Sequence, residues 1–349
     1  MAKRFDYSFL WNGGIPARIV QLAQAVQALR GMSTARAGEY GQLYGELEKI
    51  ACVQSVKSSN AIEGIVTTDA RIRAIVAQGG APLNHAEAEI AGYRDALAAI
   101  HQGHATMQVN ERSILQLHAV MQTPAGIPWA GRYKQENNLI MEMDSAGQRR
   151  IRFTPCSAAE TPQAMGQMLL AYREAAAMAG ENNLLLIPCV VLDFLCIHPF
   201  ADGNGRISRL LTLLMLYRTG HEVGRYISLE QQINNRKAAY YRALEESSRG
   251  WQQDAHDYFP FMEEFLSTLF LCYKELDNRF ALTRSGKVSK TARVEATVLD
   301  SLIPVSKAEI CALLPDVSPS TVEAVLGKMV RQGQILRIGS ARAARYVRA

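Results

Sequence analysis

The chain has 349 residues, of which 48% are hydrophobic and 20% are charged. This composition supports a large hydrophobic core and excludes the disordered and fibrous classes of protein. The net charge of +5 is unevenly distributed, because residues 283–349 carry eleven Lys or Arg and five Asp or Glu while the rest of the chain is nearly neutral. The basic excess therefore belongs to the C-terminal part.

Membrane association is not expected. The longest apolar stretch, Leu184–Ile197, is interrupted by Pro188 and Asp193 and is too short to span a bilayer. No apolar segment of a signal peptide follows the basic pair near the N-terminus. We expect a cytoplasmic protein whose six scattered cysteines are buried free thiols.

Most of the chain is predicted to be helical, because apolar residues recur at helical spacing. The predicted helices are Ile19–Leu29, Tyr40–Val53, Ala86–Ile100, Ile114–Met121, Ala164–Met178, Leu184–Ile197, Ile207–Tyr217 and Tyr258–Leu276. Residues 138–153 differ, since two short strand-like stretches flank the turn sequence Asp144–Gly147, and they predict a β-hairpin. This hairpin is either a surface excursion or a flap over a pocket.

The C-terminal part has a pattern of its own. Residues 283–290 are polar, basic and small, which is typical of a linker. Three short helices are predicted after it, at Val294–Leu302, Lys307–Leu314 and Ser320–Gln332. The alternating stretch Ile335–Val347 then predicts a small hairpin. Three helices and a hairpin are the pattern of a winged helix-turn-helix.

One segment combines several chemically active residue types: His198-Pro-Phe-Ala-Asp-Gly-Asn-Gly-Arg-Ile-Ser-Arg209. It lies between two apolar helices, the second of which begins near Asn204. Gly203 and Gly205 therefore lie at a helix N-terminus, where unpaired N–H groups and the helix dipole favour an anion. Glycine lets that anion approach the backbone closely.

The charges of this segment predict a phosphate ligand. Arg206 and Arg209 are three residues apart in the first turn of the helix, where two cations repel each other and oppose the dipole unless a polyanion lies between them. Asp202 would repel phosphate unless a Mg²⁺ ion separated the two. His198 is a group that titrates near neutral pH and is suited to take a proton from an attacking hydroxyl.

These twelve residues resemble the H-P-F-x-[DE]-G-N-G-R-x-x-R signature of Fic-domain proteins, the Fic/DOC family, with every defined position present. The resemblance implies a protein adenylyltransferase that moves AMP from Mg·ATP to a Ser, Thr or Tyr hydroxyl of a target protein. It makes His198 the general base and Asp202 the Mg²⁺ ligand. The implied ATP- and phosphate-binding residues are Gly203, Asn204, Gly205, Arg206 and Arg209.

The resemblance extends over roughly residues 110–280. The hairpin 138–153 falls where the family places a flap that is thought to hold an extended segment of the target by strand pairing. The expected fold is mainly α, with a small β-hairpin flap on a helical core. The implied domains are an N-terminal helical region at 1–109, a Fic core at 110–281, and a linker with a winged helix at 282–349.

Residues 59–64, Ser59-Asn-Ala-Ile-Glu-Gly64, resemble the [ST]-x-x-x-E-[GN] inhibitory motif of some Fic proteins. Glu63 is a carboxylate that could pair with Arg209 and compete with the γ-phosphate of ATP. A misplacement of the reacting group by about 1 Å can cost on the order of 10²-fold in rate. Ser59 would fix the helix or its contacts. The resemblance therefore implies an autoinhibited enzyme.

The basic C-terminal part raises the question of DNA binding through residues 294–349. Phosphate contacts would come from Lys328, Arg331, Arg337, Arg342 and Arg345. The predicted recognition helix, however, has few side chains that read base edges. We therefore favour a docking role for a target or partner protein.

Two other functions stay open from the sequence. The same site suits a hydrolase that removes AMP, with Glu63 positioning water, or a transferase of another phosphate-linked group. Alternatively, the chain is a winged-helix DNA-binding regulator that only senses nucleotide, which the presence of both His198 and Asp202 disfavours. The target hydroxyl is undetermined and includes those of the chain itself, and a homodimer is compatible with the sequence.

Overall fold

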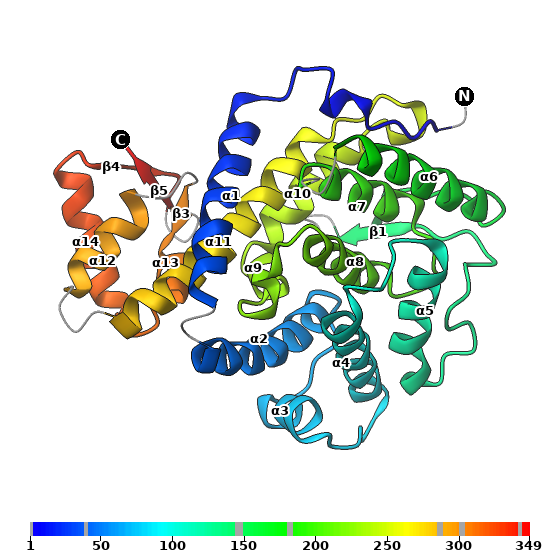
Figure 1. The fold of residues 1–349 in the computed structure, drawn as a ribbon, viewed down its shortest axis with the longest axis horizontal. Helices are drawn as coiled ribbons and strands as arrows, with labels where there is room; N and C mark the ends of the chain where they lie inside the picture. The colour runs from blue at the N-terminus through cyan, green and yellow to red at the C-terminus, as the bar shows by residue number, and fades with distance from the viewer. Residues whose placement is uncertain are drawn as a thin grey trace.

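The computed structural model describes residues 3–37, 41–143, 149–179, 184–284, 289–299, 304–340 and 344–349. Over these ranges the chain forms fourteen α-helices and two small antiparallel sheets (Figure 1). The predicted mainly-α fold is therefore confirmed. No helix within these ranges combines the length and the apolarity that a bilayer span needs.

The N-terminal helices carry the motif 59–64. These helices are α1 (Ala17–Ala37), α2 (Gly41–Ile62), α3 (Asp69–Gln78) and α4 (His85–Gly103). Ser59 lies in the last turn of α2, and Glu63 follows its last residue. The short helix α3 was not predicted, because ten residues give too few apolar repeats to establish a period.

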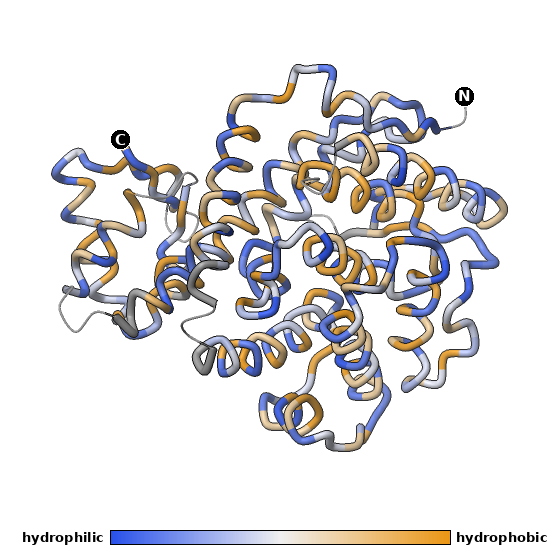
Figure 2. The backbone as a smooth tube through the Cα atoms, in the orientation of Figure 1, coloured by the Kyte–Doolittle hydropathy of each residue, from blue (hydrophilic) through white to orange (hydrophobic). Residues whose placement is uncertain are grey.

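Two apolar helices form the centre of the molecule. The helices in this part are α5 (Glu111–Gln122), α6 (Thr161–Ala179), α7 (Leu186–Ile197) and α8 (Asn204–Arg218). Every residue of α7 is buried, and α7 packs against α6, α8, α10 and α11. The predicted buried helix before His198 is therefore present. Hydrophobic residues concentrate where these helices face one another (Figure 2).

A buried carboxylate ties the N-terminal segment to α7. Asp193 accepts hydrogen bonds from the hydroxyls of Tyr7 and Tyr258, both at 2.8 Å, and from Trp251 Nε1 at 2.6 Å. Burial raises the pKa of Asp193, and the three donors satisfy the carboxylate inside the core. The acidic interruption of an otherwise apolar helix is thus a structural anchor.

Three further helices complete the body: α9 (Leu229–Asn235), α10 (Lys237–Ser248) and α11 (Phe259–Arg284). Helix α11 lies along α1 (Figure 1). Helices α9 and α10 were not predicted, because α9 is short and α10 is rich in polar residues. Their omission matters, since α10 borders the site described below.

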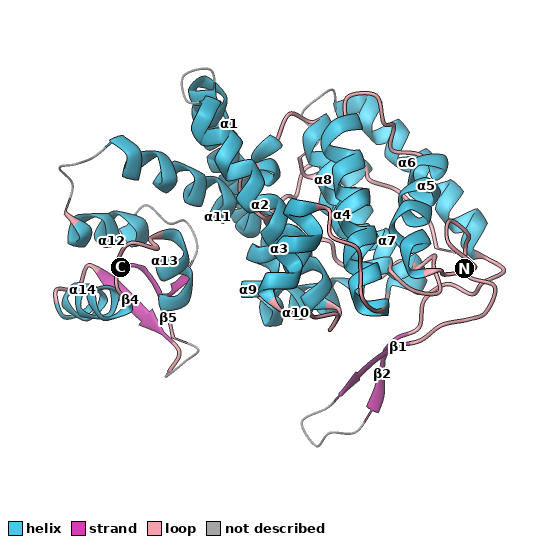
Figure 3. Ribbon diagram, turned by 90° about the horizontal axis from the view of Figure 1, so that it is seen from below, coloured by secondary structure: helices cyan, strands magenta, loops and turns pink. Residues whose placement is uncertain are grey.

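The predicted hairpin is present and projects from the helical body (Figure 3). Strand β1 (Ile140–Met143) pairs antiparallel with β2 (Arg149–Phe153), and the register is irregular between Ile140 and Met141. The predicted turn Asp144–Gly147 lies outside the described residues. Residues near the base of both strands point back to the helices.

The described residues from 289 onward are called the C-terminal module. They form α12 (Lys290–Leu299), α13 (Lys307–Leu313) and α14 (Pro319–Arg331), and a sheet of β3 (Val305–Ser306), β4 (Ile335–Ile338) and β5 (Arg345–Arg348) in the order β3-β5-β4. The predicted helices and hairpin are present, and β3 is an addition.

Some of the C-terminal predictions concern residues that belong to α11 or lie outside the described residues. Residues 283 and 284 of the predicted linker end α11, and residues 285–288 lie outside the described residues, as does Arg342. The classification as a winged helix and the domain boundaries at 109 and 281 stay predictions.

Buried ion pairs join the C-terminal module to the helical body. Arg236, between α9 and α10, donates from Nε and Nη2 to the two carboxylate oxygens of Glu264, both at 2.8 Å. Its Nη1 donates to Glu309 Oε1 on α13 at 2.9 Å. Glu309 also completes the capping box of α13 with Ser306. One guanidinium thus neutralises carboxylates from both sides of this contact.

The substitution Arg236→Ala is expected to lower the free energy of unfolding by about 3–5 kcal/mol, because it leaves the buried Glu264 carboxylate without its cation and Glu309 with Arg345 alone, at 3.4 Å. Urea unfolding followed by circular dichroism measures this change. The matched control is Arg249→Ala, which breaks an exposed pair with Glu245 and should cost less than about 1 kcal/mol. Equal losses for the two variants would contradict the importance of the buried pairs.

Candidate active site

The first feature of the site is the backbone at His198. Helix α7 ends there, with His198 in the left-handed conformation at φ 53° and ψ 60°. Glycine usually occupies such a position, and another residue costs on the order of 1–3 kcal/mol there. The His198 amide still donates to the Phe194 carbonyl at 2.9 Å. The turn redirects the chain out of the apolar helix and places the imidazole at a cavity.

The His198 imidazole is held in its neutral form. Its Nδ1 lies 3.3 Å from the Leu195 carbonyl oxygen, which can only accept, so Nδ1 carries the proton and Nε2 keeps a free lone pair. Burial lowers the pKa of His198 to about 4. The expectation of titration near neutral pH was therefore wrong, since burial disfavours the cation. The unprotonated ring is the form that a general base requires.

The Asn204 side chain holds the loop after His198. Its Oδ1 accepts from the Phe200 amide at 2.9 Å, and its Nδ2 donates to the Phe200 carbonyl at 2.7 Å. Phe200 is buried and stacks on His118, with ring centroids 3.8 Å apart. Both ends of this amide are used within the loop, so the predicted phosphate contact of Asn204 is left to its backbone N–H.

The N-terminus of α8 is open to an anion. Gly203 occupies the N-cap at φ 84°, and no side chain caps the helix there. A Cβ on Gly203 would lie 2.7 Å from Met121 Cε, and a Cβ on Gly205 would collide with the Glu63 carboxylate. Gly203 is favoured by its positive φ, and Gly205 leaves the space that the Glu63 carboxylate occupies, next to the unpaired N–H groups of the first turn.

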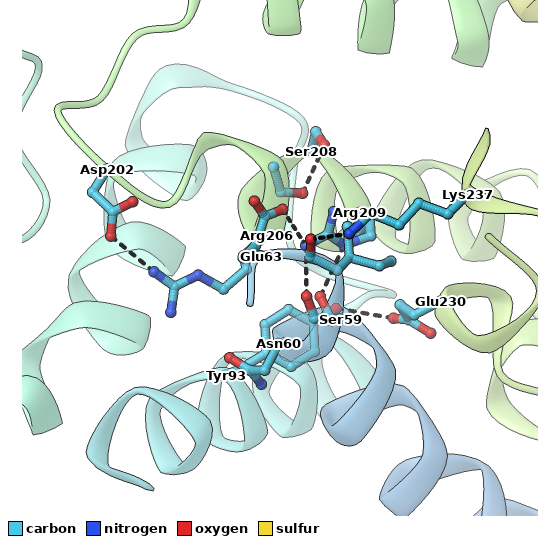
Figure 4. A network of polar contacts seen from close by, with 12 residues as sticks. Ser59, Asn60, Glu63, Tyr93, Asp202, Arg206, Ser208, Arg209, Glu230 and Lys237 are labelled. Atoms are coloured by element: carbon cyan, nitrogen blue, oxygen red, sulfur yellow. Dashed lines mark hydrogen bonds and ion pairs between the residues drawn. The ribbon is translucent and has the colours of Figure 1, made fainter. Parts of the chain in front are cut away.

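The two arginines of α8 both have carboxylate partners within the fold (Figure 4). Arg206 is 1% exposed and pairs with Glu89 at 2.7 Å and with Asp202 at 2.9 Å. Arg209 pairs with Glu63 at 2.8 Å. The pairing of Arg209 with Glu63 agrees with the sequence analysis, whereas the pairing of Arg206 with Glu89, from a distant helix, was not predicted.

The end of α2 lies directly on Arg209. Arg209 Nε donates to Ser59 Oγ at 2.9 Å, and Nη2 donates to the Ser59 carbonyl at 2.9 Å and to Glu63 Oε1 at 2.8 Å. Lys237 Nζ donates to the Ile62 carbonyl at 2.8 Å, which holds the helix end next to Glu63. The predicted contacts of Ser59 and Glu63 with the arginine are thus present (Figure 4).

Asp202 lies at the other side of Arg206. Its Oδ2 accepts from Arg206, its backbone carbonyl accepts from His118 Nε2 at 3.1 Å, and its side chain is 65% exposed. Within the described ranges, no group of three or more His, Cys, Asp or Glu side chains is suited to hold a metal. One accessible carboxylate fits Mg²⁺, which usually binds one or two carboxylates together with substrate phosphates and water.

A cavity of about 440 Å³ lies between His198 and Arg209, a volume within the range of small-molecule sites, while Ser59, Asp202, Gly203, Asn204 and Arg206 do not line it. Four of the predicted site residues line it: Glu63, His198, Gly205 and Arg209. The hairpin contributes Ile140, Met141, Arg152 and Phe153. Since both strands form part of the wall, the hairpin is a flap over a pocket and not a surface excursion.

Sequence reasoning missed one wall of the cavity. Helix α10 contributes Tyr240, Tyr241, Leu244 and Ser248. Tyr240, Leu244 and Ser248 are four residues apart along one helix face, and this spacing is a signal that could have revealed them. Glu89 and His118, which support the site from behind, gave no such signal because they lie more than eighty residues from their partners in the chain.

Comparisons with known proteins place this geometry in a family. Residues 108–216 match the model of the Fic/DOC family. This range contains α5, the flap, and helices α6 and α7 with nearly all of α8. Among curated proteins, none matches the chain.

Three solved structures share the fold. A Fic family protein from Desulfovibrio desulfuricans G20 is 22% identical, with a TM-score of 0.62 and 97% of each chain covered. A Fic domain containing signaling protein from Bacteroides thetaiotaomicron VPI-5482 is 21% identical, with a TM-score of 0.57, over 74% of this chain and 96% of that one. Fic-1 from C. elegans is 19% identical, with a TM-score of 0.56, over 76% and 74%.

The fold and the site therefore define a helical domain with a β-hairpin flap over a pocket. The chain contains a Fic domain of the Fic/DOC family, whose members are generally enzymes that transfer nucleoside monophosphates onto proteins.

Proposed function

We propose that the protein transfers AMP from Mg·ATP to a Ser, Thr or Tyr hydroxyl of a target protein, and that Glu63 keeps it weakly active. One observation carries the proposal: the cavity that holds the neutral His198 imidazole also holds Gly205 at the N-terminus of α8 and the Arg209 guanidinium. A base and an anion site thus face the same space of nucleotide size.

Residues of the cavity and of the adjoining start of α8 have assigned roles. Gly203, Gly205 and the backbone N–H of Asn204 receive phosphate oxygens, and Arg209 binds the terminal phosphate once Glu63 has left. Arg206 orients Asp202, which would hold Mg²⁺ against the phosphates. The ion, when bound, neutralises charge on the phosphate chain. The aromatic rings of Tyr240 and Tyr241 offer a face for the base.

The reaction needs one proton acceptor and one leaving group. His198 Nε2 takes the proton of the target hydroxyl, and the hydroxyl oxygen forms a bond to the α-phosphorus of ATP. The bond between the α-phosphorus and the bridging oxygen breaks, and pyrophosphate leaves. The target segment is proposed to lie extended along the flap at 138–153, where strand pairing would hold its hydroxyl near His198.

A second candidate is removal of AMP from a modified protein. Glu63 lines the same cavity as His198, so its carboxylate lies where it could hold a water molecule for attack on the phosphorus. In that case wild-type protein would be active in hydrolysis, whereas the Glu63→Gly variant would not.

Transfer of label from ATP tests the proposal. The Glu63→Gly variant is incubated with Mg²⁺ and with either α- or γ-labelled ATP, and protein-bound radioactivity is measured. We expect label from α-labelled ATP alone, on added protein or on the chain itself. Absence of α-label on protein despite measurable ATP binding would contradict the proposal. Incubating labelled protein with the wild type then tests removal of AMP.

A further inference from the structure

A buried lysine lies at the base of the flap. Lys134 is 3% exposed, and its Nζ donates to the Ile197 carbonyl at 3.2 Å and to Asn138 Oδ1 at 2.9 Å. Its backbone N–H donates to the Pro199 carbonyl at 2.9 Å. Lys134 therefore contacts the residues on both sides of His198.

Asn138 extends the same set of contacts. While its Oδ1 accepts from Lys134, its Nδ2 donates to the Phe200 carbonyl at 3.1 Å. Residues 134 and 138 together hold three carbonyls that flank His198, those of Ile197, Pro199 and Phe200. A left-handed residue persists only where its neighbours over-determine its conformation. These bonds supply that constraint.

The charge on Lys134 is not explained by an ion pair. Within the described part of the chain, no carboxylate lies at ion-pair distance from its Nζ, and its hydrogen-bond partners are neutral oxygens. A buried ammonium without a counter-charge is costly to a fold. Burial lowers the pKa of Lys134 to about 8, while the facing Cys156 thiol opposes this and the facing His198 is neutral.

We infer that Lys134 is a positioning residue for His198, and that with Asn138 it clamps the catalytic loop to the base of the flap. This inference rests on the proposed function for its catalytic consequence. The clamp fixes the carbonyl that precedes His198, so it sets the direction from which the Nε2 lone pair meets a hydroxyl held on the flap. An apolar side chain of similar length would leave the Ile197 carbonyl without its donor.

The first test measures the loop itself. Hydrogen exchange of the segment 195–204 is compared between the Glu63→Gly parent, the same protein with Lys134→Met, and a control with Lys328→Met, an exposed lysine on α14. We expect faster exchange in the Lys134 variant within this segment, and no change in the control. Unchanged exchange at 195–204 would overturn the clamp. This readout decides the clamp even if the parent transfers no AMP.

The second test separates positioning from binding. In the Lys134→Met variant, kcat for label transfer is expected to fall on the order of 10²-fold, because the base is misplaced by a fraction of an ångström to about 1 Å. The dissociation constant for ATP, measured by calorimetry, should stay within about two-fold of the parent value. A variant that keeps the parent kcat would overturn the inference, whereas a parent without transfer would contradict the proposed function.

The pH dependence gives a signature that a merely structural lysine lacks. The ammonium is present below the lowered pKa of about 8 and is lost as the pH rises through it. The neutral amine can still donate to both oxygens, but charge-assisted hydrogen bonds are roughly twice as strong as neutral ones. The ratio of parent to Lys134→Met activity should therefore narrow above pH 8, and a constant ratio would count against the clamp. If Lys134→Met does not fold, Asn138→Leu removes the second half of the clamp, and the exchange and kcat comparisons apply to it unchanged.

Discussion

Label transfer by the Glu63→Gly protein is expected to fall roughly 10²–10⁴-fold when His198 is replaced by alanine. The His198 Nε2 atom lies at the cavity beside the proposed phosphate site, where its lone pair would take the proton of the hydroxyl. Initial rates of protein labelling from α-labelled ATP measure the effect. ATP affinity should be nearly unchanged, since the phosphate-binding groups belong to α8.

The pH profile of the same reaction checks the state of His198. Because burial lowers its pKa to about 4, the neutral base persists to well below pH 6, and kcat/KM is expected to stay level from about pH 7.5 to 5 before it falls. A profile that falls through pH 6.5 would contradict a buried neutral imidazole. The matched control is His104→Ala, a histidine at the end of α4 that lies beside Tyr217 and Glu222 and does not line the cavity, which should leave rate and profile unchanged.

The substitution Glu63→Gly is expected to raise transfer on the order of 10²-fold over the wild type. Glu63 neutralises Arg209 and fills the space over Gly205, where a phosphate would otherwise lie. Removing the carboxylate frees a buried guanidinium at the positive end of α8, so the nucleotide binds with its α-phosphate aligned. The transfer rates of Glu63→Gly and of the wild type, both measured at saturating Mg·ATP, give the size of this increase.

Two controls belong to this comparison. Glu46→Gly introduces the same residue at an exposed position of the same helix and should not activate. Ser59→Ala removes one of the three hydrogen bonds to Arg209 and should activate only in part. If Glu63→Gly binds ATP but transfers no faster than wild type, the carboxylate is not the inhibitor.

The long helices could be predicted because their apolar residues repeat with a helical period. Helix α7 is the clearest case, since it is buried on every face and nearly all of its residues are apolar. Helices α3, α9 and α10 could not be predicted in the same way. The first two are shorter than the window in which a period is visible, and α10 gains its place from packing against α7 and α11.

The residues of the candidate site also fall into two groups, those that local spacing predicts and those that it does not. The twelve residues from His198 to Arg209 contain the base, the glycines and the arginines, so local spacing was enough to find them. The partner of Arg206, however, is Glu89, and the support of Asp202 is His118, both on other helices. No local pattern in the chain links these residues.

The sequence by itself determined the helical fold, the flap, the candidate anion site at the start of α8 and the pairing of Glu63 with Arg209. The tertiary structure decided which groups are charged and free to react. It neutralised Arg206 with Glu89, lowered the pKa of His198 by burial and placed the Lys134 ammonium against the Ile197 carbonyl. The physical reason is that spacing depends on neighbours in the chain, whereas desolvation and charge compensation depend on neighbours in space.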